Sequence, residues 1–217
     1  MQNETSNPTN PSIPHTPALI GPAKLLQAPI LSSVNDLMKV AIAKGLHKTN
    51  GHSTNLLFHG QSGVGKSSIV NSICSMVKPK YNSPINGRDA TIDFVRNWKI
   101  EAMYYPQEPS GLVLKVINEI DEIQVAAQSL LLSFLEEAPD NWIFLATTNE
   151  TMDSTQRFWS RWEFFFVERP TDEEICAHIS QRYGLDTKTA LAIALEAKGN
   201  VRTAENKAKA LMRLRKT

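Results

Sequence analysis

Cysteine and long apolar runs are scarce in this chain, and neither sign of charge is in excess. The 217 residues include two cysteines, Cys74 and Cys176, which lie far apart without neighbours at metal-ligand spacing. This argues against a disulfide framework or a zinc site. No apolar run approaches membrane-spanning length, and the N-terminus lacks the basic start and apolar core of a signal peptide. We therefore expect a protein of the cytoplasm, or of the nucleus in a eukaryote, with no membrane partner.

The net charge is close to zero, but charge is unevenly distributed along the chain. Lys and Arg total 23 against 22 acids, which predicts no general affinity for nucleic acid or membranes. Residues 101–140 carry eight acids and one lysine, whereas residues 198–217 carry seven bases and one acid. A basic C-terminus fits a nucleic-acid contact or a solvated helix face, and charge alone does not separate the two.

One glycine-rich stretch has the features of a phosphate-binding loop. It reads Gly60-Gln61-Ser62-Gly63-Val64-Gly65-Lys66-Ser67 and lies between the apolar run Leu56-Leu57-Phe58 and a helix expected from Ser68. Glycines let backbone N–H groups surround phosphates, and the helix N-terminus adds a positive dipole. Lys66 is expected to reach the β- and γ-phosphates, and the Ser67 hydroxyl to ligate Mg²⁺. A chance glycine-rich turn would rarely combine strand, loop, Lys-Ser and helix, so we predict a nucleotide site.

Strand and helix patterns alternate after this loop. Buried strands are predicted at residues 112–117, 142–146 and 162–167, and a helix at 126–137 that Pro139 ends. Residues 79–87 are expected to form an irregular connection, and Thr91 to Val95 fit a strand or a helix start equally well. The alternation predicts a parallel α/β sheet with its ligands at the carboxyl ends of the strands.

The chain divides into three parts. Residues 1–18 are polar and rich in proline, which predicts a disordered tail. Residues 19–169 are assigned to a nucleotide-binding α/β domain, which starts with a helix predicted between Ser33 and Gly45. Residues 170–217 are expected to form a helical lid, in which Thr171 caps the first helix and two more helices follow at 187–198 and 203–215.

The strand that ends at Ile117 should deliver a carboxylate for Mg²⁺ and a base that orients the attacking water. Asn118 and Glu119 follow it directly. Glu119 has the chemistry to polarise water, whereas Asn118 contributes an amide oxygen without charge. The competing register uses Asp121 and Glu122, but it would bury Asn118 and Glu119 in a strand without evident partners. We favour Asn118 and Glu119.

Several motifs, in chain order, carry a resemblance to a known family. They are Asn55 to Gly60 leading into the loop, Ile92-Asp93-Phe94-Val95-Arg96, Gln128-Ser129-Leu130-Leu131 and Leu135-Glu136-Glu137-Ala138-Pro139. From about Asn55 to the C-terminus the chain resembles the small subunits of sliding-clamp loaders, within the AAA+ ATPase superfamily. The resemblance implies a five-stranded parallel P-loop sheet followed by a small helical lid. It also puts Asn118 where the family has its metal-binding Asp.

The resemblance further implies ATP and Mg²⁺ as cofactors and hydrolysis of ATP. The nucleotide would contact the loop, Ser68 and Asn118, and the metal would be held by Ser67 and Asn118. Implied partners are identical or different AAA+ subunits, DNA, and a sliding clamp or other protein. A neutral amide binds metal more weakly than a carboxylate, so the Asn at position 118 predicts slow hydrolysis or weaker Mg²⁺ binding, with ATP as an assembly switch.

Three more site residues are assigned through the resemblance. Ala146-Thr147-Thr148-Asn149 is similar to the sensor-1 segment, in which Asn149 would hold the hydrolytic water with Glu119. Ser160-Arg161-Trp162 is similar to the family's Ser-Arg-Cys, which makes Arg161 the arginine finger for a neighbouring subunit, with Trp162 in place of Cys. Gly199-Asn200-Val201-Arg202 resembles the start of the sensor-2 helix, in which Arg202 would contact the γ-phosphate. A turn-capping Asn, a surface salt bridge and a solvated helix Arg are the respective structural alternatives.

Contacts with DNA rest on basic residues in or near the segment that matches the family's duplex-tracking helix: Arg88, Arg96 and Lys99. Backbone contacts need charge and position alone, and each residue taken singly fits plain solvent exposure as well. Clamp-loader subunits normally continue into a helical collar, which this sequence does not show. Two rival functions therefore stay open: a DNA-coating regulator of the transposition or defence type that assembles as an ATP-bound filament, and an inactive nucleotide-binding scaffold.

Overall fold

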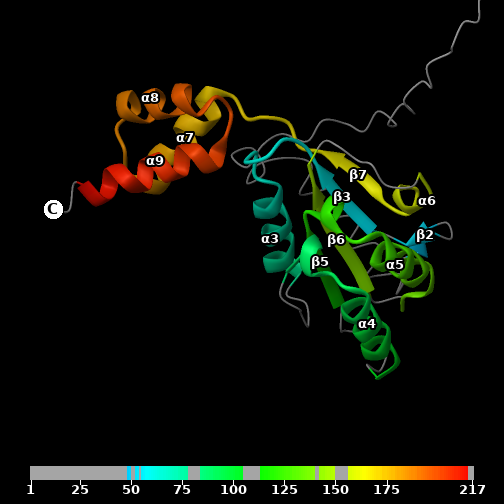
Figure 1. Ribbon diagram of the computed structural model, residues 1–217. Coiled ribbons are helices and arrows are strands. Elements are labelled where there is room, and N and C mark those ends of the chain that lie inside the picture. Colours follow the sequence, from blue (N-terminus) through cyan, green and yellow to red (C-terminus); the bar gives the residue numbers. More distant parts are fainter. Residues whose placement is uncertain are drawn as a thin grey trace, which may run out of the picture.

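The computed structural model describes residues 48–49, 52–53, 55–77, 84–104, 113–139, 142–149 and 156–214 (Figure 1). The tail predicted at residues 1–18 and the helix predicted between Ser33 and Gly45 lie outside these residues. Within them, no helix has the length and apolar character needed to cross a membrane.

Five parallel strands form the central sheet, in the spatial order β4-β5-β6-β3-β7. Their bounds are Asn55–His59 (β3), Ile85–Asn86 (β4), Val113–Asn118 (β5), Trp142–Thr148 (β6) and Glu163–Phe166 (β7). All four neighbouring pairs run parallel, so the carboxyl ends of β3, β5 and β6 meet at one edge. A separate antiparallel pair, β1 (Lys48–Thr49) and β2 (His52–Ser53), precedes β3.

Helices cover both faces of the sheet, because successive strand residues point to opposite sides. On one face α3 (Lys66–Val77) buries Ile69 and Ile73 against Leu56, Phe58 and Leu145. The other face is covered by α4 (Ile92–Tyr104), α5 (Val125–Glu137) and α6 (Gln156–Trp159). Its core is aromatic, with the buried side chains Trp98, Phe134, Trp142, Phe144 and Phe158. The predicted α/β fold with a five-stranded parallel sheet is confirmed.

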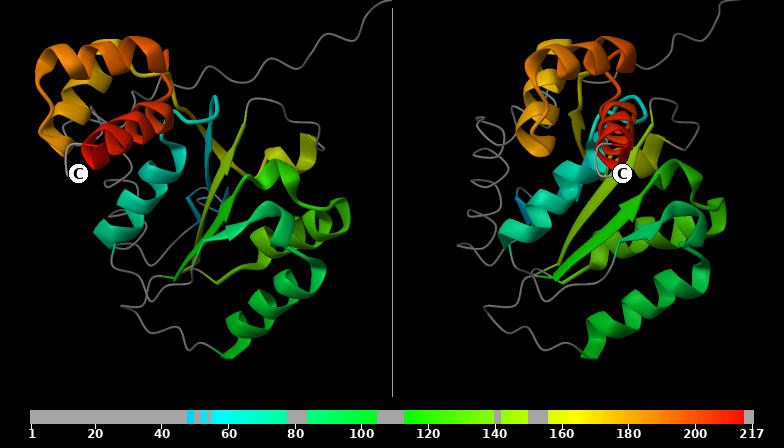
Figure 2. Two further views of the ribbon diagram at one scale, coloured as in Figure 1. Left: turned by 60° about the vertical axis from the view of Figure 1, so that its left-hand side comes forward. Right: turned by 90° about the vertical axis from the view of Figure 1, so that its left-hand side faces the viewer.

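Three helices form the lid, which has an apolar core of its own. They are α7 (Asp172–Tyr183), α8 (Thr187–Ala197) and α9 (Val201–Leu214). The lid lies beyond the N-terminal end of α3 (Figures 1 and 2). Thr171 caps α7 as predicted, since its hydroxyl accepts the N–H of Glu174 while the Glu174 carboxylate accepts the N–H of Thr171.

Two regions differ from what the sequence pattern indicated. The connection predicted at residues 79–87 contains β4, whose Ile85 pairs with Ile117 at the sheet edge. Two residues are too few to produce a periodic pattern. The segment from Thr91 to Val95 starts a helix rather than a strand. Thr91 directly precedes α4, and its hydroxyl accepts the N–H of Phe94. Val95 and Trp98 of α4 then pack into the aromatic core.

Candidate functional site

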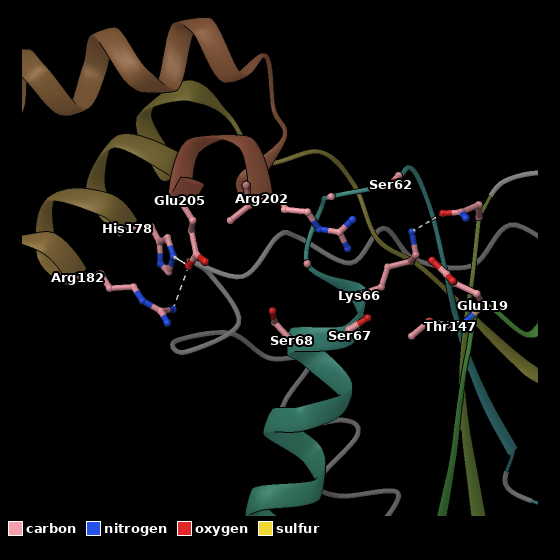
Figure 3. Close-up of a pocket in the computed structure, with 14 residues that line it drawn as sticks. Ser62, Lys66, Ser67, Ser68, Glu119, Thr147, His178, Arg182, Arg202 and Glu205 are labelled. Carbon is pink, nitrogen blue, oxygen red and sulfur yellow. Dashed lines mark hydrogen bonds and ion pairs between the residues drawn. The ribbon is translucent and has the colours of Figure 1, made fainter. Parts of the chain in front are cut away.

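A cavity of about 300 Å³ lies where the loop, the strand ends and the lid meet (Figure 3). The loop and the start of α3 form its floor, and α7 and α9 of the lid form the opposite wall. Glu119, Thr147 and Asn149 line its end at the sheet. Of the predicted loop residues, those that line the cavity are Ser62, Gly63, Gly65, Lys66, Ser67 and Ser68.

The loop is held close to the sheet edge. Gly60 has a φ of +150°, and a Cβ there would lie 2.4 Å from the carbonyl oxygen of Val167. The Val167 N–H donates to the carbonyl of His59 at 2.8 Å, which brings the end of β7 against the loop. A side chain at Gly60 would therefore push the loop off the sheet.

Lys66 is a buried cation that the loop already surrounds with oxygen acceptors. Its Nζ donates to the carbonyls of Gly60 (2.6 Å) and Gln61 (2.8 Å) and to Asn149 Oδ1 (3.2 Å). The side chain is 8% exposed. The structure thus brings together two residues, Lys66 and Asn149, that stand 83 positions apart, at the place where phosphate oxygens can take over as acceptors.

Glu119 lines the cavity in a left-handed backbone conformation with a φ of 53°. Its N–H donates to Thr147 Oγ1 at 3.1 Å, and Asn86 Nδ2 donates to its carboxylate at 2.8 Å. A non-glycine residue in this region costs on the order of 1 kcal/mol, and such residues cluster at functional sites. Thr147 also donates to Asn118 Oδ1 at 3.3 Å, so one hydroxyl fixes both residues.

The competing acidic pair is engaged elsewhere. Asp121 accepts a hydrogen bond from Thr148 Oγ1 at 2.9 Å, and Glu122 pairs with Arg88 at 2.5 Å. Both carboxylates lie in the short 3-10 turn Ile120–Glu122, after β5 has ended at Asn118. Glu119 is therefore the acid of this segment that borders the cavity.

The lid contributes a charged wall that the sequence motifs did not indicate, apart from Arg202. Glu205 Oε1 lies 3.1 Å from His178 Nε2 and 3.0 Å from Arg182 (Figure 3). Burial opposes ionisation of Glu205, but the hydrogen bond to His178 and the charges of Arg182 and Lys209 outweigh it and lower the pKa of this carboxyl. Arg202 extends from the start of α9 over the loop. Asn86 was missed as well, since no motif marks it, and Thr147 was given no role although it stands in the segment that resembles sensor 1.

Arg161 does not line this cavity. It lies in the turn after α6, where its Nε and one terminal nitrogen donate to Glu136 Oε1 at 2.9 and 2.6 Å. Its carbonyl accepts from Asn55 Nδ2 at 3.0 Å. The hydrogen bond from Arg161 lowers the pKa of Glu136.

The three basic residues predicted to contact DNA all have partners on their own chain. Arg88 pairs with Glu122 at 2.5 Å and Arg96 with Asp93 at 2.8 Å. Lys99 donates to Ser133 at 3.2 Å and lies 3.4 Å from Glu137. The pair of Arg96 with Asp93 is exposed on both sides and is therefore weak, whereas Lys99 and Glu122 are half-buried.

Comparisons with known proteins agree with this architecture. The model of the ATPase family associated with various cellular activities (AAA) matches residues 56–168, which is more than half of the chain. No curated protein sequence matches at a significant level.

Two solved proteins illustrate the structural similarity. RuvB from Thermotoga maritima has a TM-score of 0.67 at 18% identity over 84% of this chain and 60% of its own. PCH-2 from C. elegans has a TM-score of 0.60 at 15% identity, over 86% of this chain and 68% of its own. At such identities the likeness concerns the fold. The chain spans between 60% and 64% of the length of the RuvB chains it matches.

Proposed function

This chain belongs to the AAA family of ATPases, and from that membership we propose that it binds and hydrolyses ATP in the cavity between its phosphate-binding loop and its lid. The observation that carries the proposal is the convergence of Lys66, Glu119, Asn149 and Arg202 on one cavity. They come from four separate segments, and each supplies chemistry that phosphoryl transfer to water requires.

Each of these residues has one role in the proposed reaction. Lys66 exchanges its loop carbonyls for β- and γ-phosphate oxygens. Glu119 polarises the attacking water, which Asn149 helps to hold. Arg202 contacts the γ-phosphate from the lid and stabilises the charge that develops there.

Two oxygen donors, one that lines the cavity and one at the end of β5 that does not line it, fit a hydrated magnesium ion. Ser67 offers a hydroxyl and Asn118 an amide oxygen, and Mg²⁺ in nucleotide sites keeps several waters and few protein ligands. When bound, the ion neutralises charge on the phosphates. Because Asn118 brings no charge, we expect weak metal binding and slow turnover.

We propose further that ATP-bound subunits assemble and act on DNA in replication or repair, as clamp loaders do, by loading or remodelling a partner protein. Arg161 would then enter the ATP site of the adjacent subunit, and Arg88, Arg96 and Lys99 would exchange their own acids for phosphates. The motif order from Asn55 onwards supports this proposal.

One observation favours a second candidate, in which ATP serves mainly for assembly or folding. Asn118, where the resemblance puts the family's metal-binding Asp, is a neutral amide that accepts a hydrogen bond from Thr147. The chain would then hydrolyse ATP slowly as an ATP-assembled coat on DNA, or not at all as a scaffold. Steady-state ATPase assays with and without DNA separate the scaffold from the other two. Electron microscopy of the ATP-bound protein on DNA separates a ring from a filament.

Replacing the loop lysine tests the nucleotide site. We expect Lys66→Ala to abolish ATP binding, because it removes the buried cation at the phosphates. Titration with a fluorescent ATP analogue measures this, and Lys188→Ala, which removes an exposed lysine of α8, is the control. Thermal melting of both variants checks the fold. Unchanged affinity in Lys66→Ala would refute the proposed site.

A further inference from the structure

The lid is fastened to the phosphate-binding loop by the residues at the start of α9. Asn200 Nδ2 donates to the carbonyl of Ser62 at 3.3 Å. The N–H groups of Val201 and Arg202 both point to the carbonyl of Gly63, at 2.9 and 3.4 Å. We refer to these five residues as the lid latch. Its bonds join segments that stand 138 positions apart.

Asn200 uses both ends of its side-chain amide in this contact. Its Oδ1 accepts the N–H of Thr203 at 3.0 Å and so caps α9, while its Nδ2 reaches the loop. Gly63, with a φ of +82°, leaves the space that the amide occupies, since a Cβ there would lie 2.3 Å from Asn200 Oδ1. The loop glycine and the lid asparagine therefore fit each other.

The turn before Asn200 also contacts Arg169, which lies in the segment between the sheet and the lid. Lys198 has a left-handed backbone with a φ of 48°, and its carbonyl accepts from Arg169, in the segment that joins the sheet to the lid, at 3.5 Å. The aliphatic part of Arg169 lies against Gly199, within 3.1 Å of the position of a Cβ there. These contacts tie the turn to the segment before the lid, so a shift of the loop would be passed to the start of α9.

Resting on the proposed ATPase function, we propose that Asn200 is a positioning residue: it transmits the shape of the phosphate-filled loop to α9 and so sets Arg202 on the γ-phosphate. Arg202 follows Asn200 by two positions, and its own N–H belongs to the latch. ADP lacks the γ-phosphate that Arg202 would contact. Asn200 should therefore govern the preference for ATP over ADP more than affinity for nucleotides in general.

The variant Asn200→Ser distinguishes the contact of Asn200 with the loop from its capping of α9. Serine caps a helix as well as asparagine does, but it carries no amide N–H to reach Ser62. We expect wild-type ADP affinity within about twofold, and a loss of ATP preference and of kcat of about three- to tenfold, the worth of one hydrogen bond. The control for general weakening of the lid is Asp186→Ala, which removes the cap of α8 away from the loop, where the Thr189 N–H donates to Asp186 Oδ1 at 2.9 Å.

A double-mutant cycle tests whether Asn200 acts through Arg202. If it does, adding Asn200→Ser to Arg202→Ala should lower ATP affinity and kcat no further. Equal losses for ATP and ADP, additive effects in the cycle, or a match between Asn200→Ser and Asp186→Ala would each overturn the positioning role. A wild-type protein that binds no nucleotide would overturn the proposed function together with this inference.

Discussion

Lys115 is a charged side chain in the middle of the sheet, with 1% of its surface exposed. Its Nζ lies 2.5 Å from the half-exposed carboxylate of Glu101 on α4 and is 4.6 Å from the ring centre of Trp142. Desolvation is the largest influence and lowers the pKa of Lys115, against the opposing effect of Glu101. Methionine has a similar shape without the charge, and Glu101 can return to water, so Lys115→Met should cost less than about 1 kcal/mol near neutral pH.

The lowered pKa gives this substitution a pH signature. Between the folded-state pKa of Lys115 and its ordinary value of 10.5, the unfolded chain binds more protons than the folded one, so wild-type stability rises with pH there. Lys115→Met should lack this rise, as urea denaturation of both proteins across the alkaline range will measure. Glu101→Gln, which leaves the lysine without its counter-charge, should destabilise by roughly 3 kcal/mol at neutral pH. If the free energy of unfolding changed with pH in the same way for wild type and Lys115→Met, the lowered pKa of Lys115 would be contradicted.

Single site residues were predictable to the extent that a motif marked them. The loop and Glu119 were named from the residues that follow two predicted strands, and Asn149 and Arg202 through the family resemblance. All border the cavity or join its hydrogen bonds. The contacts of Asn86 and Thr147 with Glu119 were not predicted, because they depend on which strands become neighbours in the sheet. No local sequence pattern encodes that order. His178 and Glu205 escaped for the same reason, since they face each other across two lid helices.

Elements were predicted best where a local signal exists. Thr171 caps α7 as expected, and the structure adds Glu174 as its partner in a capping box. The helices α5 and α8 end within one residue of the expected positions. β4 has two residues and belongs to the sheet only through its pairing with β5. The start of α4 could not be predicted, because the apolar pattern of Thr91 to Val95 fits both the periodicity of a helix and the alternation of a strand.

The capping box of α7 allows a prediction about the stability of this helix. Thr171→Ala removes the acceptor of the Glu174 N–H and should destabilise the lid by about 1 kcal/mol. Thr187→Ala is the control, since α8 is capped by Asp186 instead. Hydrogen exchange of the first turn of α7, with thermal melting, measures the loss. Equal exchange in the two variants would show that the box contributes nothing to the lid.

The arrangement of the whole molecule leaves Arg161 outside the cavity between the loop and the lid of its own chain. The resemblance to AAA+ subunits predicted this, but not what holds the residue in a single subunit. Glu136 on α5 binds the guanidinium, and Asn55 at the start of β3 binds the carbonyl. These contacts join positions 25 and 106 residues apart, so sequence spacing could not reveal them. In the proposed assembly, these contacts would hold Arg161 in place before it enters the site of an adjacent subunit.

Mixing two inactive variants tests whether Arg161 acts in an adjacent subunit. Arg161→Ala should bind ATP normally but lose turnover by roughly 10³-fold or more, the usual worth of an arginine finger. Lys66→Ala should bind no ATP yet still present Arg161. Mixed together, they should recover part of the wild-type ATPase rate, because some interfaces then pair an intact loop with an intact finger. Arg157→Ala, which removes an exposed arginine of α6, should keep full activity. A mixture as inactive as its components at every protein concentration would mean that Arg161 serves only its bond to Glu136.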